Sequence, residues 1–402
     1  VIKDLISSGV DPKDICYYSF DDPALFSGRL NKEEFINSLF NSKGRLRYLF
    51  LDEIQNLESW ELYLKKYYDL GFPLKIVVSG SATSPIFKKS RESLLGRLKD
   101  YHLLPFSFYE FALFKSQDKP EVFKSLQSSR EHGRALFTHT DSINPVWQGG
   151  LMYDELNGLL FSYMMNGGFP EAWDLPSMQA RQDYLYDNQI KKVIFEDLVI
   201  AADFRKPENL KRFFISLLEN PGKEISLSTF ATETEINLQQ IQKYLPLLEM
   251  TDLVYSLPKF RAQVLRIRKG LAKYYISDLA LRNAVMRITS LTPEDPNTLG
   301  LYAENLVYLA LRRQRDILQV DYYREKDVEV DFILHTPPGE YIPLEVKYRN
   351  RIEKKYLKGL EHFASKHKNV GRPVVITKNE EDAGEMFNAL AIPLPYFLIY
   401  TG

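Results

Sequence analysis

The chain has few of the features that mark secreted or membrane proteins. Its 402 residues include one cysteine, Cys16, so no internal disulfide can form, which is typical of the reducing cytoplasm. No run of about 18 apolar residues, the length that a membrane-spanning helix needs, occurs in it. The formal net charge of −1 excludes a uniformly basic nucleic-acid binder but permits local basic patches. A chain of this length is expected to form about two to four domains.

The most informative segment is 48–55, Tyr-Leu-Phe-Leu-Asp-Glu-Ile-Gln. A short apolar run that ends in two carboxylates predicts a buried strand of a parallel sheet, with Asp52 and Glu53 at its carboxyl end. Ligands of open α/β sheets bind at that edge. The pattern is typical of the Walker B motif of P-loop ATPases. We therefore expect Asp52 to hold Mg²⁺ with bound ATP, and Glu53 to orient or activate the attacking water.

The phosphate-binding partner of that motif is missing, because no G-x-x-x-x-G-K-[S/T] occurs in the chain. Residues 1–9 have the pattern of the end of a helix, and a strand-like run at 15–20 leads to Asp21 and Asp22. In a P-loop fold, a strand, the phosphate loop and a helix precede that point. We expect the chain to be a fragment that lacks this upstream unit. The alternative is a degenerate ATPase fold that never had the loop.

The pattern changes along the chain predict an α/β protein of several parts. A second buried strand at 74–78 ends in Ser79-Gly80-Ser81, which completes the α/β pattern of the first part. The expected parts are a truncated P-loop ATPase core (1–114), an insertion or linker (115–150), a helical lid (151–222), a winged helix-turn-helix (223–285) and a last α/β domain (295–402).

Residues 223–260 have the element order of a winged helix. Asn237 is placed to cap a second helix, on which Gln239, Gln240, Gln242 and Lys243 would enter a DNA major groove. The stretch from Lys259 to Lys273 carries four further cations and no acid, which suits a DNA-binding patch. The alternative is that this unit serves only as a packing module.

Carboxylates gather in the predicted last domain. Glu304 lies on a predicted helix, Asp331 in a strand at 328–334, and Glu345 and Lys347 on one face of a strand at 343–347. Converging at a sheet edge, Asp331 and Glu345 would bind Mg²⁺ and activate water for phosphodiester cleavage. Lys347 would steady the nucleophile or the developing phosphate charge. The alternative is an exposed hairpin with solvated charges.

Taken in order, these motifs resemble a family of bacterial and archaeal AAA-type P-loop ATPases with a carboxy-terminal domain of unknown function, itself similar to PD-(D/E)xK nucleases. The matching segments are 48–55, V-V-S-G-S-A (77–82), L-L-G-R (94–97) with L-P-F-S-F-Y-E-F (104–111), G-G-F-P-E-A (167–172), K-Y-Y-I-S-D-L-A (273–280), Y-A-E-N-L-V (302–307), E-V-D-F (329–332), L-E-V-K (344–347) and I-P-L-P-Y-F-L (392–398). The resemblance implies that Ser79 or Ser81 contacts the γ-phosphate or the attacking water, and that Arg97 stabilises charge. The chain departs from the family in lacking Walker A.

Three functional hypotheses follow. In the first, a cytoplasmic ATPase moves a DNA-acting tail that uses Glu304, Asp331, Glu345 and Lys347 as a nuclease. In the second, the tail is a catalytically silent binding module of a nucleotide-dependent switch, which self-associates so that Arg97 reaches a neighbour's site. In the third, the chain is an inert interaction protein. Convergence of Asp331, Glu345 and Lys347 within reach of a metal would favour the first.

Overall fold

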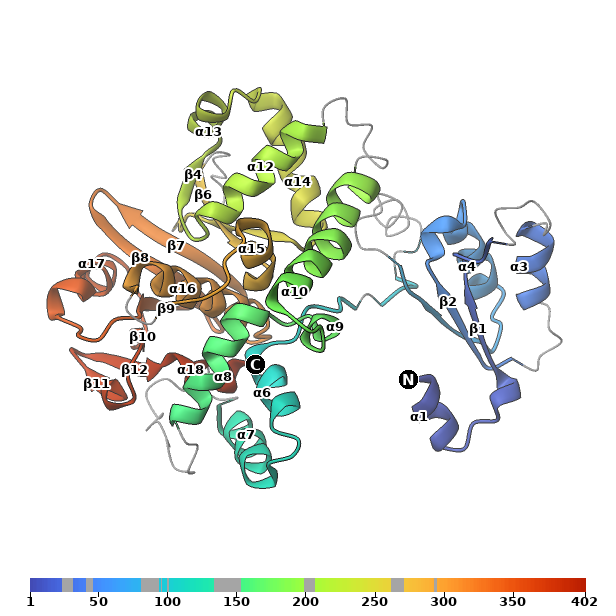
Figure 1. Ribbon diagram of the computed structural model, residues 1–402, viewed down its shortest axis with the longest axis horizontal. Coiled ribbons are helices and arrows are strands. Elements are labelled where there is room, and N and C mark those ends of the chain that lie inside the picture. Colours follow the sequence, from blue (N-terminus) through green and yellow to red (C-terminus); the bar gives the residue numbers. More distant parts are fainter. Residues whose placement is uncertain are drawn as a thin grey trace. The chain divides into compact units, whose positions relative to one another are not determined.

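The computed structural model describes residues 1–23, 32–40, 46–80, 94, 96–99, 101–133, 153–198, 207–261, 271–292 and 295–402. The chain forms two compact units (Figure 1). Unit 1 comprises Val1–Leu103 with Glu196–Phe204, and unit 2 comprises Leu104–Phe195 with Arg205–Gly402. In this division the helix after Leu103 belongs to unit 2, because its Phe108 and Phe111 are buried in the core of that unit.

Unit 1 is built on a parallel sheet whose strands lie in the order β1-β2-β3. The central strand β2 has three consecutive buried residues, Leu49 to Leu51, which fits a strand covered on both faces. Trp60 and Leu64 of helix α4 are buried in the same core. The three strands predicted in this region are confirmed. The elements are α1 (Ile2–Ser7), η1 (Pro12–Asp14), β1 (Ile15–Ser19), α3 (Lys32–Phe40), β2 (Tyr48–Asp52), η2 (Ile54–Asn56), α4 (Trp60–Asp69) and β3 (Lys75–Val78).

Unit 2 begins with helices. They are α6 (Phe108–Lys115), α7 (Pro120–Gly133), α8 (Tyr153–Asn166), α9 (Pro170–Trp173), α10 (Met178–Leu185) and η3 (Tyr186–Leu198). Helix α7 lies in the segment 115–150, which was predicted to be an insertion or linker; its Leu126 is fully buried, and the helix contacts α18 (Leu394–Thr401) at the end of the chain. The remainder of that segment, 134–150, lies outside the described residues.

The predicted break at 167–170 separates α8 from α9. The Gly168 carbonyl accepts a hydrogen bond from the Phe106 amide at 2.8 Å, and a Cβ at Gly168 would come within 2.2 Å of the Phe106 carbonyl oxygen. Asp278 accepts the Gly168 amide at 2.6 Å. Three of the motifs quoted above therefore meet here, and their role in unit 2 is to pack its segments together.

A helix–strand–helix–helix–strand–strand unit follows. Its small sheet is antiparallel in the order β4-β6-β5, so β6, the last strand, is central. Asn237 accepts a hydrogen bond from the Gln239 amide at 2.8 Å and caps α14, as predicted. The elements are α12 (Pro207–Glu219), β4 (Glu224–Ser226), α13 (Leu227–Thr234), α14 (Leu238–Met250), β5 (Val254–Pro258), β6 (Leu271–Ile276) and α15 (Leu279–Met286). Residues 262–270 of the basic stretch lie outside the described residues.

The last part of unit 2 is a six-stranded sheet in the order β11-β12-β10-β9-β8-β7 (Figure 1). Strands β9, β10 and β12 are parallel, and the hairpins β7-β8 and β8-β9 are antiparallel. One core joins Phe332 and Leu344 to α16 and α18, and another joins Ile333 to α17. The elements are α16 (Pro296–Arg312), β7 (Gln319–Glu325), β8 (Val328–Thr336), β9 (Glu340–Lys347), η4 (Lys354–Leu357), α17 (Lys358–Lys366), β10 (Val374–Thr377), η5 (Glu380–Asp382), β11 (Gly384–Met386), β12 (Ala389–Pro393) and α18.

The small sheet and the six-stranded sheet are joined within unit 2. The Phe260 amide, just after β5, donates to the Tyr322 carbonyl of β7 at 2.6 Å. Among the helices in the described part of the chain, none has both the length and the apolar character that crossing a bilayer requires.

Candidate functional site

In unit 1, Asp52 lies at the carboxyl end of β2 beside the end of β3. Its carboxylate accepts hydrogen bonds from the Ser79 hydroxyl at 2.6 Å and from the Tyr17 hydroxyl at 2.8 Å. The Ser79 bond is the main reason that the pKa of Asp52 is lowered, with the Tyr17 bond adding to it. Asp52 is therefore an ionised carboxylate at the carboxyl edge of the parallel sheet, where open α/β sheets bind ligands.

Of the other residues predicted for the site in unit 1, the structure describes Glu53 and Arg97. Glu53 follows Asp52 in a left-handed conformation, with φ of 49°, and its carboxylate accepts from the Gln55 side-chain amide. Arg97 donates to Asp69, at the end of α4, at 2.8 Å, the salt bridge that a structural role for this arginine would require. Ser81 lies outside the described residues.

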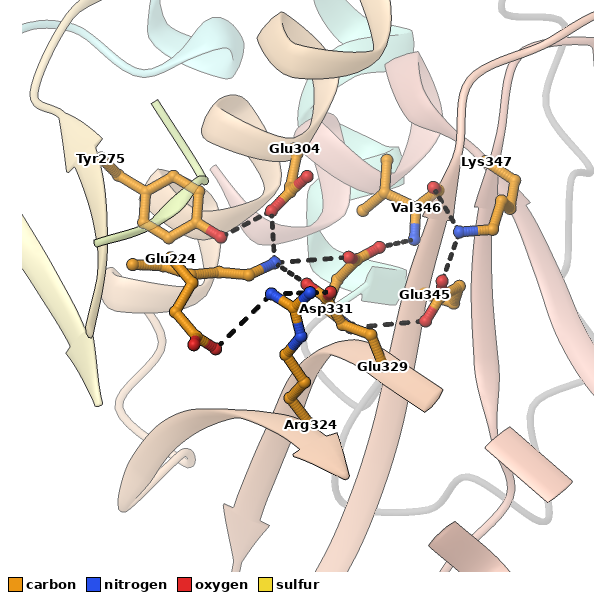
Figure 2. Close-up of polar contacts among 10 residues, drawn as sticks. Glu224, Tyr275, Glu304, Arg324, Glu329, Asp331, Glu345, Val346 and Lys347 are labelled. Atoms are coloured by element: carbon orange, nitrogen blue, oxygen red, sulfur yellow. Dashed lines mark hydrogen bonds and ion pairs between the residues drawn. The ribbon is translucent and has the colours of Figure 1, made fainter. Parts of the chain in front are cut away.

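In unit 2, Asp331, Glu345 and Lys347 come together where the pairing of β8 with β9 ends (Figure 2). The last paired residues are Phe332 and Leu344. Beyond them, the Asp331 carboxylate accepts the Val346 amide at 2.9 Å, and the Glu345 carboxylate accepts the Asp331 amide at 3.3 Å. The Lys347 ammonium contacts the other Glu345 oxygen. These side chains take the place of backbone pairing at the point where the strands separate.

Glu304 reaches the same cluster from helix α16. Its Oε1 accepts the Tyr275 hydroxyl at 2.7 Å and lies 3.1 Å from the Lys273 ammonium. Tyr275 and Lys273 are two residues apart in β6, so they extend from the same face of the small sheet. Glu304 is thus joined to Asp331 through the ammonium of a lysine of the small sheet.

Lys273 is the residue of this site that the sequence did not single out. Its Nζ lies 2.7 Å from Glu329 and 3.6 Å from Asp331, in addition to its contact with Glu304. Its side chain is only 3% exposed. A lysine inside the otherwise apolar strand Leu-Ala-Lys-Tyr-Tyr-Ile was the available signal, because a buried lysine needs an acidic partner.

The charge state of Lys273 follows from its surroundings. Burial alone would lower the pKa of its ammonium, but attraction by the three carboxylates, Glu304 first, outweighs burial and raises that pKa above its ordinary value. Conversely, burial raises the pKa of Glu304, against the opposing effect of Lys273. The lysine is therefore a fixed positive charge in this cluster.

A pocket of about 740 Å³ opens beside the cluster. Glu304, Asp331 and Lys347 line it, together with three further cations, Lys223, Arg349 and Lys378. Within the described residues, no group of three or more histidine, cysteine, aspartate or glutamate side chains is arranged to hold a metal ion.

Glu345 makes the stability of unit 2 depend on pH. Burial, and then repulsion from Asp331, raise the pKa of Glu345 from 4.5 to about 8. Between these values the unfolded chain releases a proton that the folded chain keeps, so the free energy of unfolding falls as the pH rises through this window. We expect Glu345→Gln to remove that fall, as measured by urea unfolding at pH 5 to 8.

The control for that prediction is Glu385→Gln, which removes a carboxylate that is 71% exposed on the same sheet. It is expected to leave the pH profile unchanged. The prediction would be contradicted if the free energy of unfolding changed equally with pH in the wild-type chain and in Glu345→Gln.

The parallel sheet of unit 1, with an ionised aspartate at the end of its central strand, is the arrangement that AAA domains share. Residues 1–112 match the family model of an AAA domain. AAA domains bind nucleotides, usually with Mg²⁺, so this AAA domain indicates a nucleotide-binding ATPase. Two models of domains of unknown function match the rest of the chain, DUF8612 at residues 157–292 and DUF4143 at residues 299–397.

Similarity to proteins of other organisms extends across all three matched segments. Two uncharacterized proteins of Methanocaldococcus jannaschii are each 24% identical to this chain, over 379 and 384 residues. Each alignment covers 92% of this chain, and 77% and 76% of the respective protein. An uncharacterized protein of Haemophilus influenzae is 24% identical over 338 residues, which cover 82% of this chain and 73% of that protein. The AAA domain and the segments after it thus occur together in proteins of an archaeon and a bacterium.

Proposed function

We propose that the chain is an AAA-type ATPase acting as a nucleotide-dependent switch, with unit 2 as its DNA-binding module. In this proposal, residues 223–285 form a winged helix and residues 295–402 have a PD-(D/E)xK nuclease-like fold. The observation that carries the proposal is the pocket beside Asp331, which is lined by four cations from three segments of the chain. Cations grouped in this way suit the phosphates of a nucleic acid.

The residues of the AAA domain fit the nucleotide half of this proposal. Asp52 would hold Mg²⁺ on ATP, because it is ionised and lies at the sheet edge. The ion would supply electrostatic stabilisation to the transferred phosphate. Glu53 would orient water, and Ser79, which already donates to Asp52, would keep that carboxylate in position. Self-association is also proposed, and in it Arg97 would exchange Asp69 for a neighbour's nucleotide.

The DNA half can be tested by fluorescence anisotropy with labelled single-stranded, duplex and branched DNA. We expect the double variant Arg349→Ala/Lys378→Ala to bind DNA more weakly. The slope of log affinity against log salt concentration is expected to fall by about one for each cation removed. The matched control is Lys358→Ala, which removes an exposed lysine of α17 that does not line the pocket. An unchanged slope in the double variant, or equal loss in the control, would contradict the proposal.

A second function, Mg²⁺-dependent phosphodiester cleavage, is favoured by the proximity of Asp331, Glu345 and Lys347. It is tested by incubating the same DNA substrates with Mg²⁺ or Mn²⁺ and the wild-type chain or Lys347→Ala. Cleavage that disappears in the variant would make unit 2 a nuclease regulated by the AAA domain. Binding without cleavage by either chain would support the switch with a catalytically silent module.

A further inference from the structure

One face of helix α16 forms a wall of the pocket beside Asp331. Asn297, Gly300, Leu301 and Glu304 line the pocket, and positions three or four residues apart lie on one face of a helix. At Gly300, an added Cβ would have no heavy atom within 4 Å, apart from its chain neighbours and the backbone of its own helix. Glycine is among the least favourable residues inside a helix. Gly300 thus leaves room in the pocket that a side chain would fill.

We propose that the pocket receives one unstacked nucleotide, so that the DNA bound by unit 2 is single-stranded where it enters. This inference rests on the proposed DNA binding and names the form of DNA that is bound. The pocket volume of about 740 Å³ lies within the range of about 300–1,000 Å³ that is typical of sites for small molecules. The bases of a duplex are stacked and paired, so a base must leave the duplex before it can enter such a pocket.

The lining of the pocket changes in character with depth. Lys223 is exposed and Arg349 and Lys378 are half-buried, whereas Val346 and Tyr348 are buried. The cations would contact a phosphate at the entrance, and the apolar side chains would contact the flat face of a base. A surface that binds only the phosphates of a duplex does not require an apolar recess.

Two carboxylates also line the pocket. Glu304 and Asp331 each contact the Lys273 ammonium, at 3.1 and 3.6 Å, which offsets part of their charge. Their remaining charge disfavours a phosphate beside them, so the phosphate is expected on the side of the cations at the entrance. Base amino groups can donate hydrogen bonds to carboxylates, so the base is expected to point inward, beside Gly300.

Arg349 provides a surface on which a base can stack. Its guanidinium carbon lies 4.3 Å from the centroid of the Tyr356 ring, and Tyr356 itself does not line the pocket. The ring therefore supports the flat guanidinium from outside the pocket. Unpaired bases stack on arginine planes and aromatic rings, and such stacking tolerates different base sequences. Arg349 thus offers both a charge and a stacking surface.

The test is fluorescence anisotropy of the full chain with a labelled single strand and with a blunt duplex of the same sequence, at one salt concentration. We expect the single strand to bind about tenfold more tightly, since stacking of one base contributes a factor of that order. Gly300→Phe, which fills the pocket without changing its charge, is expected to remove this preference and to leave duplex binding unchanged. The control is Gly158→Phe, at an exposed position of α8 where an added Cβ also has no such atom within 4 Å.

The outcomes separate this inference from the proposed function. Equal affinity of the wild-type chain for the two forms of DNA, or a preference that survives in Gly300→Phe, would overturn the inference and leave the proposed DNA binding intact. Binding of neither form would contradict the proposed function, and the inference with it. Displacement of the single strand by free deoxyadenosine monophosphate, at an equal concentration of nucleotides, would identify a free nucleotide as the ligand and would also overturn the inference.

A second arm does not depend on how Gly300→Phe packs. Arg349→Lys keeps the positive charge but removes the flat guanidinium. It is expected to lower the affinity for the single strand several-fold, with no change in duplex affinity or in the salt dependence of either affinity. An equal loss for both forms of DNA would show that Arg349 contacts only phosphate, and the stacking role would fail.

Discussion

Lys273→Met is expected to lower the free energy of unfolding of unit 2 by about 3–5 kcal/mol, the usual cost of removing one partner from a buried ion pair. The lysine is 3% exposed and contacts three carboxylates, so its loss leaves negative charge with little solvent to compensate it. Because the pKa of Lys273 is raised in the folded state, its contribution is fully present below the unfolded pKa, near 10.5, and is lost as the pH rises from that value through the folded pKa.

Hydrogen exchange of peptides spanning β6 and α16 measures this effect in unit 2 separately from unit 1. The control is Lys358→Met, at an exposed position of α17, which is expected to change stability by less than about 0.5 kcal/mol. Adding Glu304→Gln to Lys273→Met is expected to recover part of the loss, because the two side chains are in contact. A loss below about 1 kcal/mol in Lys273→Met would contradict the prediction, because surface salt bridges typically contribute no more than that.

Asn305→Ala is expected to cost roughly 2–6 kcal/mol, because its side chain accepts the Ile276 amide and donates to the Ile276 carbonyl, both at 2.9 Å, and each group left without a partner costs about 1–3 kcal/mol. Asn305 is fully buried, so water cannot replace its amide. The matched control is Asn297→Ala in the exposed first turn of the same helix. Equal thermal stability of the two variants would contradict the role given to Asn305, and faster exchange confined to β6 in Asn305→Ala would support it.

Local sequence predicted the strands well, because burial leaves a short-range pattern. The run Tyr48 to Leu51 gave the central strand of unit 1, and alternation around Val346 placed Glu345 and Lys347 together. Asn237 identified the start of α14 because a capping side chain acts on its own neighbours. In each case the physical cause lies within a few residues of its effect.

Features that depend on distant partners were not predictable in this way. Helix α7 is polar and serine-rich, and its burial depends on α18, more than 200 residues later in the sequence. Lys273 was grouped with a basic stretch suited to DNA, since nothing nearby shows that its acids lie in α16 and β8. Alternation fixes which side of a strand a residue occupies, but only the register of β8 against β9 brings Asp331 to Val346.

The ion cluster also couples the stability of two segments that match separate family models. Lys273 belongs to the segment 157–292, and Glu304, Glu329 and Asp331 belong to the segment 299–397. Recombination that exchanged one segment for an unrelated sequence would leave either a buried ammonium or a group of buried carboxylates uncompensated. A change at position 273 is therefore expected to be tolerated best when a compensating change occurs in the other segment.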